Sequence, residues 1–336
     1  MARRDIIVMG GSTGSRTVLS QILSGLPRDL PASLFVTTHL ASRSGPFLAH
    51  MLGKTSSLPV VHASDGQPIE RGCVYVAVPD HHMLIIDGTV RLGDGPRENM
   101  ARPAVDPLFR SAALSYGPRA VGVILSGLLN DGASGLSSIK ACGGMAVVQH
   151  PLDAEADQMP LAALETVSVD EVAPAKDLAP VIAAIVGREA PDPVPPPDNL
   201  LLEVEIAAGN RLGTESLRSI ADPAALTCPD CHGVMSEVRG EQPLRYRCQI
   251  GHASTAQVLE ARGKEVDEAV RIALRVMEER LTLVRRMGVD ARRTGRNTVA
   301  ELYEARAEEF ARYTSVLRDA AASSVRSRAP ARQAEL

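Results

Sequence analysis

The chain has 336 residues, 45% hydrophobic and 23% charged, which is ordinary for a globular protein of about two domains and excludes neither an enzyme nor a binding module. Aromatic residues make up 3% and the formal net charge is −4, so we expect no platform for stacking bases and no nucleic-acid partner. No stretch approaches the ~18 apolar residues of a membrane-spanning helix, and the N-terminal apolar run is too short for a signal peptide. We therefore expect a cytoplasmic protein without membrane insertion.

Short apolar runs alternate with helical patterns up to about residue 188, and this alternation predicts βαβ units with a mostly parallel sheet. The predicted strands are Asp5–Met9, Leu34–Thr38, Cys73–Val78, Ala120–Leu125 and Met145–Gln149, with an antiparallel hairpin over Met83–Leu92 turning at Asp87-Gly88. The predicted helices are Ser15–Ser24, Gly45–Leu52, Val105–Tyr116, Ala133–Cys142 and Asp177–Val186.

A glycine-rich turn follows the first predicted strand. Residues Gly10–Gly14 fit the pattern G-x-S-x-G, in which glycines allow a sharp turn that exposes the hydroxyl of Ser12 at a helix N-terminus. The same turn could be a plain βα connection or a site for any anion, although it lacks the lysine of a phosphate-binding loop. A nucleophilic serine therefore needs a base and an acid from elsewhere in the chain.

Two further polar residues stand just beyond predicted strands. His39 closes the second strand and Asp131 lies in the turn after Ala120–Leu125. An open parallel sheet places its ligands at the carboxyl edge, where Ser12, His39 and Asp131 would meet. Imidazole can take the serine proton and a buried carboxylate can orient the imidazole, which suggests acyl transfer. Taken singly, His39 could be a hydrogen-bonded histidine at a strand end and Asp131 a helix cap.

Several separate motifs then carry a family resemblance. Segment 5–188 resembles the catalytic domain of the chemotaxis protein-glutamate methylesterases, the CheB family, and these matches occur in one order over more than half of the chain. The matching pieces are Gly11-Ser12-Thr13-Gly14, His39, the run from Arg71 to Pro79 with His81-His82-Met83, Arg102-Pro103-Ala104-Val105-Asp106, and Asn130-Asp131-Gly132-Ala133-Ser134-Gly135.

The resemblance implies a doubly wound α/β domain that hydrolyses methyl esters of glutamyl side chains on methyl-accepting chemotaxis receptors, with glutamine deamidation as a related activity. It assigns Ser12 as nucleophile, His39 as base and then acid, and Asp131 as the orienting acid. The backbone N–H of Thr13 would meet the oxyanion, with Leu128 as a supporting residue beside it. No cofactor is expected for catalysis.

Three departures limit this transfer. Leu128-Leu129 stands where the family usually has Met-Gly, and Leu40-Ala41 follows His39 where Met-Pro is common. The first strand begins at Asp5, whereas many members carry a phosphorylatable receiver domain ahead of it, so we expect no regulation by an attached receiver. The alternative function is a non-catalytic chemosensory adaptor that keeps the fold, and Leu128-Leu129 favours it.

A proline-rich stretch, Pro191–Asp198, is typical of a semi-rigid spacer and marks the boundary of the catalytic domain, 1–188. Residues 189–226 are predicted as this linker and a connecting segment, which contains one strand-like run, Leu200–Ile206.

The pattern C-x₂-C followed by C-x₃-H, with Leu244–Arg247 as a strand before the third ligand, predicts a zinc-ribbon-like module at 227–255. A structural zinc would be held by three cysteines and one histidine: Cys228, Cys231, Cys248 and His252. His232 is the competing imidazole, and reduced cysteines without metal or an exchange-active C-x-x-C remain alternatives.

Apolar residues recur at three- and four-residue steps from Ala256, with a break at Gly295-Arg296-Asn297. This periodicity predicts a helical hairpin or coiled coil at 256–322, a surface for other chemosensory proteins, followed by a disordered tail at 323–336.

Overall fold

A computed structural model describes residues 2–40, 47–210, 213–261 and 263–326. The chain divides into two compact units, Met1–Leu259 and Glu260–Leu336. The first unit contains the candidate site, and the second contains two long helices.

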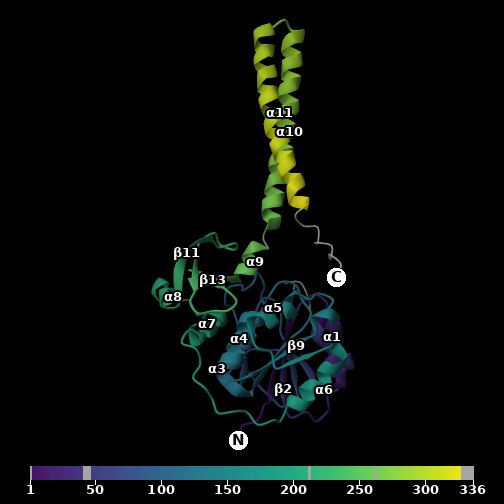
Figure 1. Cartoon of the computed structure of the whole chain (residues 1–336), viewed down its shortest axis with the longest axis vertical. Helices are drawn as coiled ribbons and strands as arrows, with labels where there is room; N and C mark the ends of the chain where they lie inside the picture. The colour runs from purple at the N-terminus through teal and green to yellow at the C-terminus, as the bar shows by residue number, and fades with distance from the viewer. Residues whose placement is uncertain (1, 41–46, 211–212, 262, 327–336) are drawn as a thin grey trace, which may run out of the picture. The chain divides into compact units, whose positions relative to one another are not determined.

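A parallel sheet forms the centre of the first unit (Figure 1). It has seven strands in the order β10-β9-β8-β1-β2-β5-β3. Its strands are β1 Ile6–Gly11, β2 Ser33–Thr38, β3 Val60–His62, β5 Val74–Val76, β8 Ala120–Ile124, β9 Met145–Gln149 and β10 Glu171–Ala173. The predicted doubly wound sheet is confirmed. The chain leaves β1 toward β2 on one side and later returns to β8 on the other, so the strand order reverses beside β1.

Two apolar layers cover the faces of this sheet. Ile7 and Met9 of β1 point into a core shared with α1 and α6, whereas Ile6 and Val8 point into a core shared with α3 and α4. Burial on both faces explains why this strand is a continuous apolar run. The helices are α1 Ser15–Gly25, α2 Phe47–Thr55, α3 Val105–Tyr116, α4 Ala133–Ala141, α5 Gln158–Thr166 and α6 Ala175–Ile185.

The predicted hairpin is confirmed as β6 His82–Ile86 and β7 Thr89–Gly93, which form a small sheet with β4 Gln67–Pro68. The predicted helix at Gly45–Leu52 begins at Phe47 in the described residues, and residues 41–46, including Ala41, lie outside them.

One sequence prediction is wrong. The strand-like run Leu200–Ile206 is a helix, α7 Leu200–Ala208. The buried residues recur at helical spacing on one side of this helix: Leu200, Glu203, Val204 and Ala207. The helix ends at Ala208, and Gly209 caps it. A short unbroken apolar run does not distinguish a strand from a buried helix, which explains the error.

Between residues 221 and 255 the chain forms a third sheet, which is antiparallel and is here called the sheet module. Its strands are β11 Ala221–Thr227, β12 Val234–Val238, β13 Arg245–Cys248 and β14 Ala253–Thr255. Helix α8 Thr214–Ile220 precedes it and α9 Ala256–Glu260 follows it. The predicted strand before the third cysteine, Leu244–Arg247, corresponds to β13.

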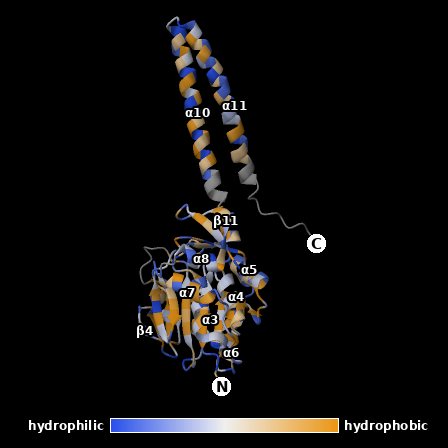
Figure 2. Cartoon of the chain, turned by 90° about the vertical axis from the view of Figure 1, so that its left-hand side faces the viewer, coloured by the Kyte–Doolittle hydropathy of each residue, from blue (hydrophilic) through white to orange (hydrophobic). Residues whose placement is uncertain are grey.

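The second unit is an antiparallel pair of helices, α10 Gly263–Arg293 and α11 Asn297–Arg326, in which hydrophobic and hydrophilic residues alternate (Figure 2). The helical hairpin is therefore confirmed. Helix α11 runs past Ser323, the predicted start of the tail, and residues 327–336 lie outside the described part. None of the described helices combines the length and the apolar character needed to cross a membrane.

Candidate active site

Three loops meet at the carboxyl edge of the large sheet. Ser12 directly follows β1, His39 directly follows β2, and Asp131 lies in the loop between β8 and α4. Strands β2 and β8 are the two hydrogen-bonded neighbours of β1. The three side chains therefore converge where the strand order reverses, which is the usual ligand position in an open α/β sheet.

The turn that carries Ser12 is held from both sides. The backbone N–H of Ser12 donates to the carbonyl of Ser126 at 2.9 Å, and the hydroxyl of Ser126 donates to the carbonyl of Thr13 at 2.7 Å. Gly14 then begins α1 with a φ of 79°, and a Cβ there would lie 2.6 Å from the Ser126 hydroxyl. Only glycine fits this position, so the loops after β1 and β8 can lie against each other.

The three side chains form one hydrogen-bonded row. The Ser12 hydroxyl lies 3.1 Å from His39 Nδ1, and His39 Nε2 lies 2.7 Å from Asp131 Oδ2. The ionised carboxylate accepts only, so Nε2 carries the proton and Nδ1 is free to accept the Ser12 proton. The side chain of His39 is 29% exposed and that of Asp131 is 1% exposed. The row therefore runs from a solvent-accessible hydroxyl to a buried acid.

The carboxylate of Asp131 accepts four hydrogen bonds. Oδ2 accepts from His39 Nε2 and from the backbone N–H of Val105, each at 2.7 Å. Oδ1 accepts from Asn99 Nδ2 at 3.0 Å and from the backbone N–H of Asp106 at 3.2 Å. The two backbone donors are the first residues of α3, whose N-terminus favours a negative charge. This helix can approach because β1 has Gly10 there, where a Cβ would lie 2.1 Å from Val105 Cγ1.

These contacts shift the pKa values of His39, Asp131 and Asp106 in different directions. Burial alone would lower the pKa of His39, but the hydrogen bond and charge of Asp131 outweigh it and raise this pKa above 6.5. Burial alone would raise the pKa of Asp131, but the hydrogen bond and charge of His39 hold it below its ordinary value. Burial and then the Asp131 charge raise the pKa of Asp106 to about 7. The negative charge of this carboxylate pair is thus favoured on Asp131.

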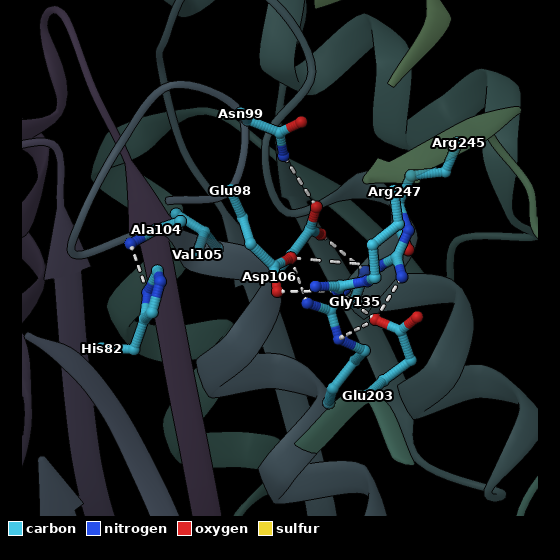
Figure 3. Close-up of polar contacts among 12 residues, drawn as sticks. His82, Glu98, Asn99, Ala104, Val105, Asp106, Gly135, Glu203, Arg245 and Arg247 are labelled. Carbon is cyan, nitrogen blue, oxygen red and sulfur yellow. Dashed lines mark hydrogen bonds and ion pairs between the residues drawn. The ribbon is translucent and has the colours of Figure 1, made fainter. Parts of the chain in front are cut away.

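Asn99 is a site residue that sequence reasoning missed. Its Nδ2 donates to Asp131 and also to Asp106 Oδ2 at 2.9 Å, so one amide bridges the two carboxylates; Figure 3 shows the contact with Asp106. The available signal was its position three residues before Arg102 in the matched run Arg102–Asp106. No periodicity distinguishes Asn99 from an ordinary loop asparagine.

Two pockets adjoin the row, and both are lined by Ser12 and His39. One, of about 370 Å³, is lined by Thr13 on the α1 side, and the other, of about 570 Å³, is lined by Leu128 and Leu129. Leu128 is 49% exposed. Leu129 has a φ of 62°, the left-handed conformation that glycine adopts freely. The backbone therefore keeps a glycine-like turn although the sequence has leucine.

A second group of chemically active side chains lies in the sheet module. One ligand atom from each of Cys228, Cys231, Cys248 and His252 lies within 4.8 Å of the others. The Cys231 and Cys248 sulfurs are 3.6 Å apart, and His252 Nδ1 lies 3.6 Å from Cys248 Sγ and 3.8 Å from Cys228 Sγ. Among the described residues, the structure groups His252 rather than His232 with the three sulfurs.

Fold and site together define a doubly wound α/β protein with a hydroxyl–imidazole–carboxylate row at the carboxyl edge of its sheet. A family model described as CheB methylesterase matches residues 7–182, more than half of the chain. The chain therefore belongs to the CheB methylesterase family, as its motifs predicted.

Individual relatives agree with this assignment. The chain is 39% identical over 177 residues to protein-glutamate methylesterase/protein-glutamine glutaminase 2 of Anaeromyxobacter dehalogenans, covering 53% of this chain and 52% of that protein. It is 40% identical over 169 residues to a putative protein of the same description from Leptospira interrogans, covering 50% and 88%. The chain thus spans about half of the first relative and most of the second.

A solved structure is also similar. The crystal structure of the Thermotoga maritima CheB methylesterase catalytic domain matches with a TM-score of 0.53 and 32% identity, covering 55% of this chain and all of that one.

Proposed function

We propose that this protein is a protein-glutamate methylesterase that uses Ser12, His39 and Asp131 to hydrolyse methyl esters of glutamyl side chains on methyl-accepting chemotaxis receptors, with glutamine deamidation as a second activity. The observation that carries the proposal is the unbroken row Ser12–His39–Asp131, with spacings of 3.1 and 2.7 Å. The names of the relatives support the substrate class.

The proposed reaction proceeds in two halves. Ser12 Oγ attacks the ester carbonyl while His39 Nδ1 takes its proton, and Asp131 stabilises the imidazolium through Nε2. His39 then gives the proton to the departing methanol, which leaves an acyl ester on Ser12. A water, deprotonated by His39, releases the glutamyl carboxylate and restores the serine.

The oxyanion of each intermediate would face the backbone N–H of Thr13, which makes no hydrogen bond to any of the described residues. The exposed Leu128 side chain would line the second pocket beside Ser12 and His39, which we propose as the substrate pocket. A backbone donor aimed at developing charge is the usual means of stabilising such an intermediate.

Methanol release from a methylated receptor fragment tests the function. Wild type should release methanol, and Ser12→Ala should reduce the rate by about 10⁴-fold or more because the nucleophile is lost. Asp131→Asn should reduce it by roughly 10⁴-fold because the imidazole loses its orienting charge. Equal rates in all three proteins would refute the enzyme and favour the non-catalytic adaptor.

We further propose that the sheet module holds a structural zinc at Cys228, Cys231, Cys248 and His252. Zinc bound to sulfur at about 2.3 Å in tetrahedral geometry separates its ligand atoms by about 3.5–3.8 Å, which agrees with the observed spacings of 3.6–3.8 Å. A closed set of four protein ligands suits a structural role.

Metal analysis of the purified chain tests this site. We expect about one zinc per chain, and a lower unfolding temperature after chelation because metal binding contributes to folding. The double variant Cys231→Ser/Cys248→Ser should lose the zinc. The control is Cys142→Ser, which changes a buried cysteine in the apolar core between the large sheet and helices α3 and α4, and this variant should keep the zinc. Full zinc occupancy in the double variant would rule out this ligand set.

Other chemosensory proteins are proposed partners of the α10–α11 hairpin. This proposal is supported by the exposure of apolar side chains along both helices: Leu283 is 61%, Leu302 67% and Val316 66% exposed.

A further inference from the structure

The sheet module is joined by its last strand to the loop that carries Asn99. The N–H of Asn99 donates to the carbonyl of Ala253 at 2.9 Å, and the N–H of Ala253 donates to the carbonyl of Arg97 at 3.2 Å. Glu98 and Ala253 thereby form a parallel bridge. Strand β14 begins immediately after His252, so this connection lies next to the cysteine–histidine cluster.

Thr255, the last residue of β14, makes two hydrogen bonds to residues around the acid. Its N–H donates to Asn99 Oδ1 at 3.2 Å, and its hydroxyl donates to Asn130 Oδ1 at 2.7 Å. Asn130 directly precedes Asp131, and Asn99 donates to Asp131. Thr255 is completely buried. One residue of the module therefore contacts both Asn99, which is bonded to the Asp131 carboxylate, and Asn130, which precedes Asp131 in the chain.

The Thr255 N–H restricts the orientation of the Asn99 amide. A backbone N–H can only donate, so it requires the amide oxygen on its side and thereby turns the NH₂ group toward the two carboxylates. Without this contact the side chain of Asn99 loses the partner of its oxygen, and a buried polar group without a partner is costly. The bond from Asn99 to Asp131 thus depends on the position of β14.

A buried ion cluster keeps the module in place. The cluster joins Arg110 of α3 and Glu98 of the loop before it to Glu203 of α7. The two arginines of the sheet module, Arg245 and Arg247, pair with Glu203 (Figure 3). Arg247 pairs with Glu98 at 3.0 Å and closely with Glu203. All five side chains are at most 2% exposed. Buried charges stripped of their partners are strongly destabilising, so this contact resists separation.

We propose that the sheet module holds the Asp131 carboxylate in its reactive position through Thr255 and Asn99, which makes these two residues positioning residues for the esterase. The inference rests on the proposed function for its effect on rate. Its structural content, the coupling of Asn99 to the Asp131–His39 pair, can be measured without turnover.

Asn99→Gly is the test variant. Asn99 has a φ of 49°, which glycine adopts freely, so the change removes the amide without straining the loop. We expect kcat to fall roughly 10- to 100-fold, because the Asp131 carboxylate is displaced from His39. Thr255→Val removes the hydroxyl that donates to Asn130 and accepts from the N–H of Val258, and it should act in the same direction with a smaller effect.

A double-mutant cycle separates positioning from general damage. If Asn99 acts through Asp131, Asn99→Gly should cause little further loss in the Asp131→Asn background. The control is Asp87→Gly in the β6–β7 turn, where φ is 46°, and it should leave the rate unchanged. A wild-type kcat in Asn99→Gly, or a loss fully retained in the Asp131→Asn background, would overturn the proposal.

The measurement that does not need turnover is the pKa of His39, followed by NMR of ¹⁵N-histidine-labelled protein. Burial lowers the pKa of His39, and Asp131 raises it more than the charge of Asp106 does, so displacement of the Asp131 carboxylate in Asn99→Gly should lower this pKa. An unchanged pKa would overturn the proposal even if the chain released no methanol, whereas absent methanol release with a lowered pKa would refute only the proposed function.

Discussion

His39 has a partly buried ring and a carboxylate partner, and these two features set the pH range in which it can accept a proton. Only neutral imidazole can take the Ser12 proton, and Asp131 raises the pKa of His39 above 6.5. We therefore expect kcat/KM for ester hydrolysis to rise with pH through an apparent pKa above 6.5 and to be lost progressively below it. A pH series on wild type with a methylated receptor fragment measures this limb.

Asp131→Asn provides the comparison for this pH dependence. Without the Asp131 charge, the pKa of His39 should fall because burial lowers it and only the Asp106 charge still raises it, so the acid limb of the residual activity should move to lower pH. A limb that stays in place in Asp131→Asn would assign it to another group, and a wild-type limb at or below 6.5 would contradict the role of Asp131.

Leu129 shows how the site keeps its shape despite a departure from the family pattern. A left-handed conformation costs a residue with a Cβ about 1–2 kcal/mol, and leucine retains it at φ 62°. Its N–H donates to Gln158 Oε1 at 2.7 Å, which holds the turn against α5. The loss of the family glycine at this position therefore leaves the loop before Asp131 in a glycine-like conformation.

Among the elements, those with one clear period could be predicted from the sequence. Helix α3 begins and ends at the predicted residues, Val105 and Tyr116, because its apolar faces follow a helical period. Helix α7 was predicted as a strand, since an apolar run of seven residues fits both periods. Its buried Glu203 pairs with Arg245 of β13, a contact between distant segments that no local pattern predicts.

The candidate site could be predicted in part for the same reason. Ser12, His39 and Asp131 follow strands that are neighbours in the sheet, so topology alone brings them to one edge. Asn99 and Thr255 are 156 residues apart in the chain. Asn99 lies in the loop before α3 and Thr255 ends β14, and no spacing rule connects them. The residues proposed to react were therefore visible in the sequence, whereas the residues proposed to position them were not.

Over the whole first unit, a buried ion cluster joins segments that are far apart in the chain. Glu98 precedes α3, Arg110 lies within it, and Arg245 and Arg247 lie on β13. A buried ion cluster often stabilises a protein no more than apolar residues of similar volume would, but removing one of its members strongly destabilises the protein. The sheet module is thus attached to the large domain by charges that water would otherwise solvate.

Glu203→Gln tests how far this attachment stabilises the protein. The change keeps the shape of the side chain but removes the charge that faces Arg245 and Arg247, so the free energy of unfolding should fall by about 3–5 kcal/mol at neutral pH. Asp222→Asn, the same change in the exposed pair with Arg239, should cost less than about 1 kcal/mol. Denaturant unfolding measures both, and equal effects would show that the cluster contributes no more than a surface pair.

The pH dependence of this difference identifies its source. Burial alone would raise the pKa of Glu203, but Arg245, Arg247 and Arg110 outweigh it and lower the pKa to about 2. A carboxylate with a lowered pKa contributes stability above its unfolded value of about 4.5, and this contribution is lost as pH falls toward the folded value. The difference between wild type and Glu203→Gln should therefore shrink between pH 4.5 and 2, because protonated glutamate resembles glutamine. A difference independent of pH would assign the destabilisation to packing instead of charge.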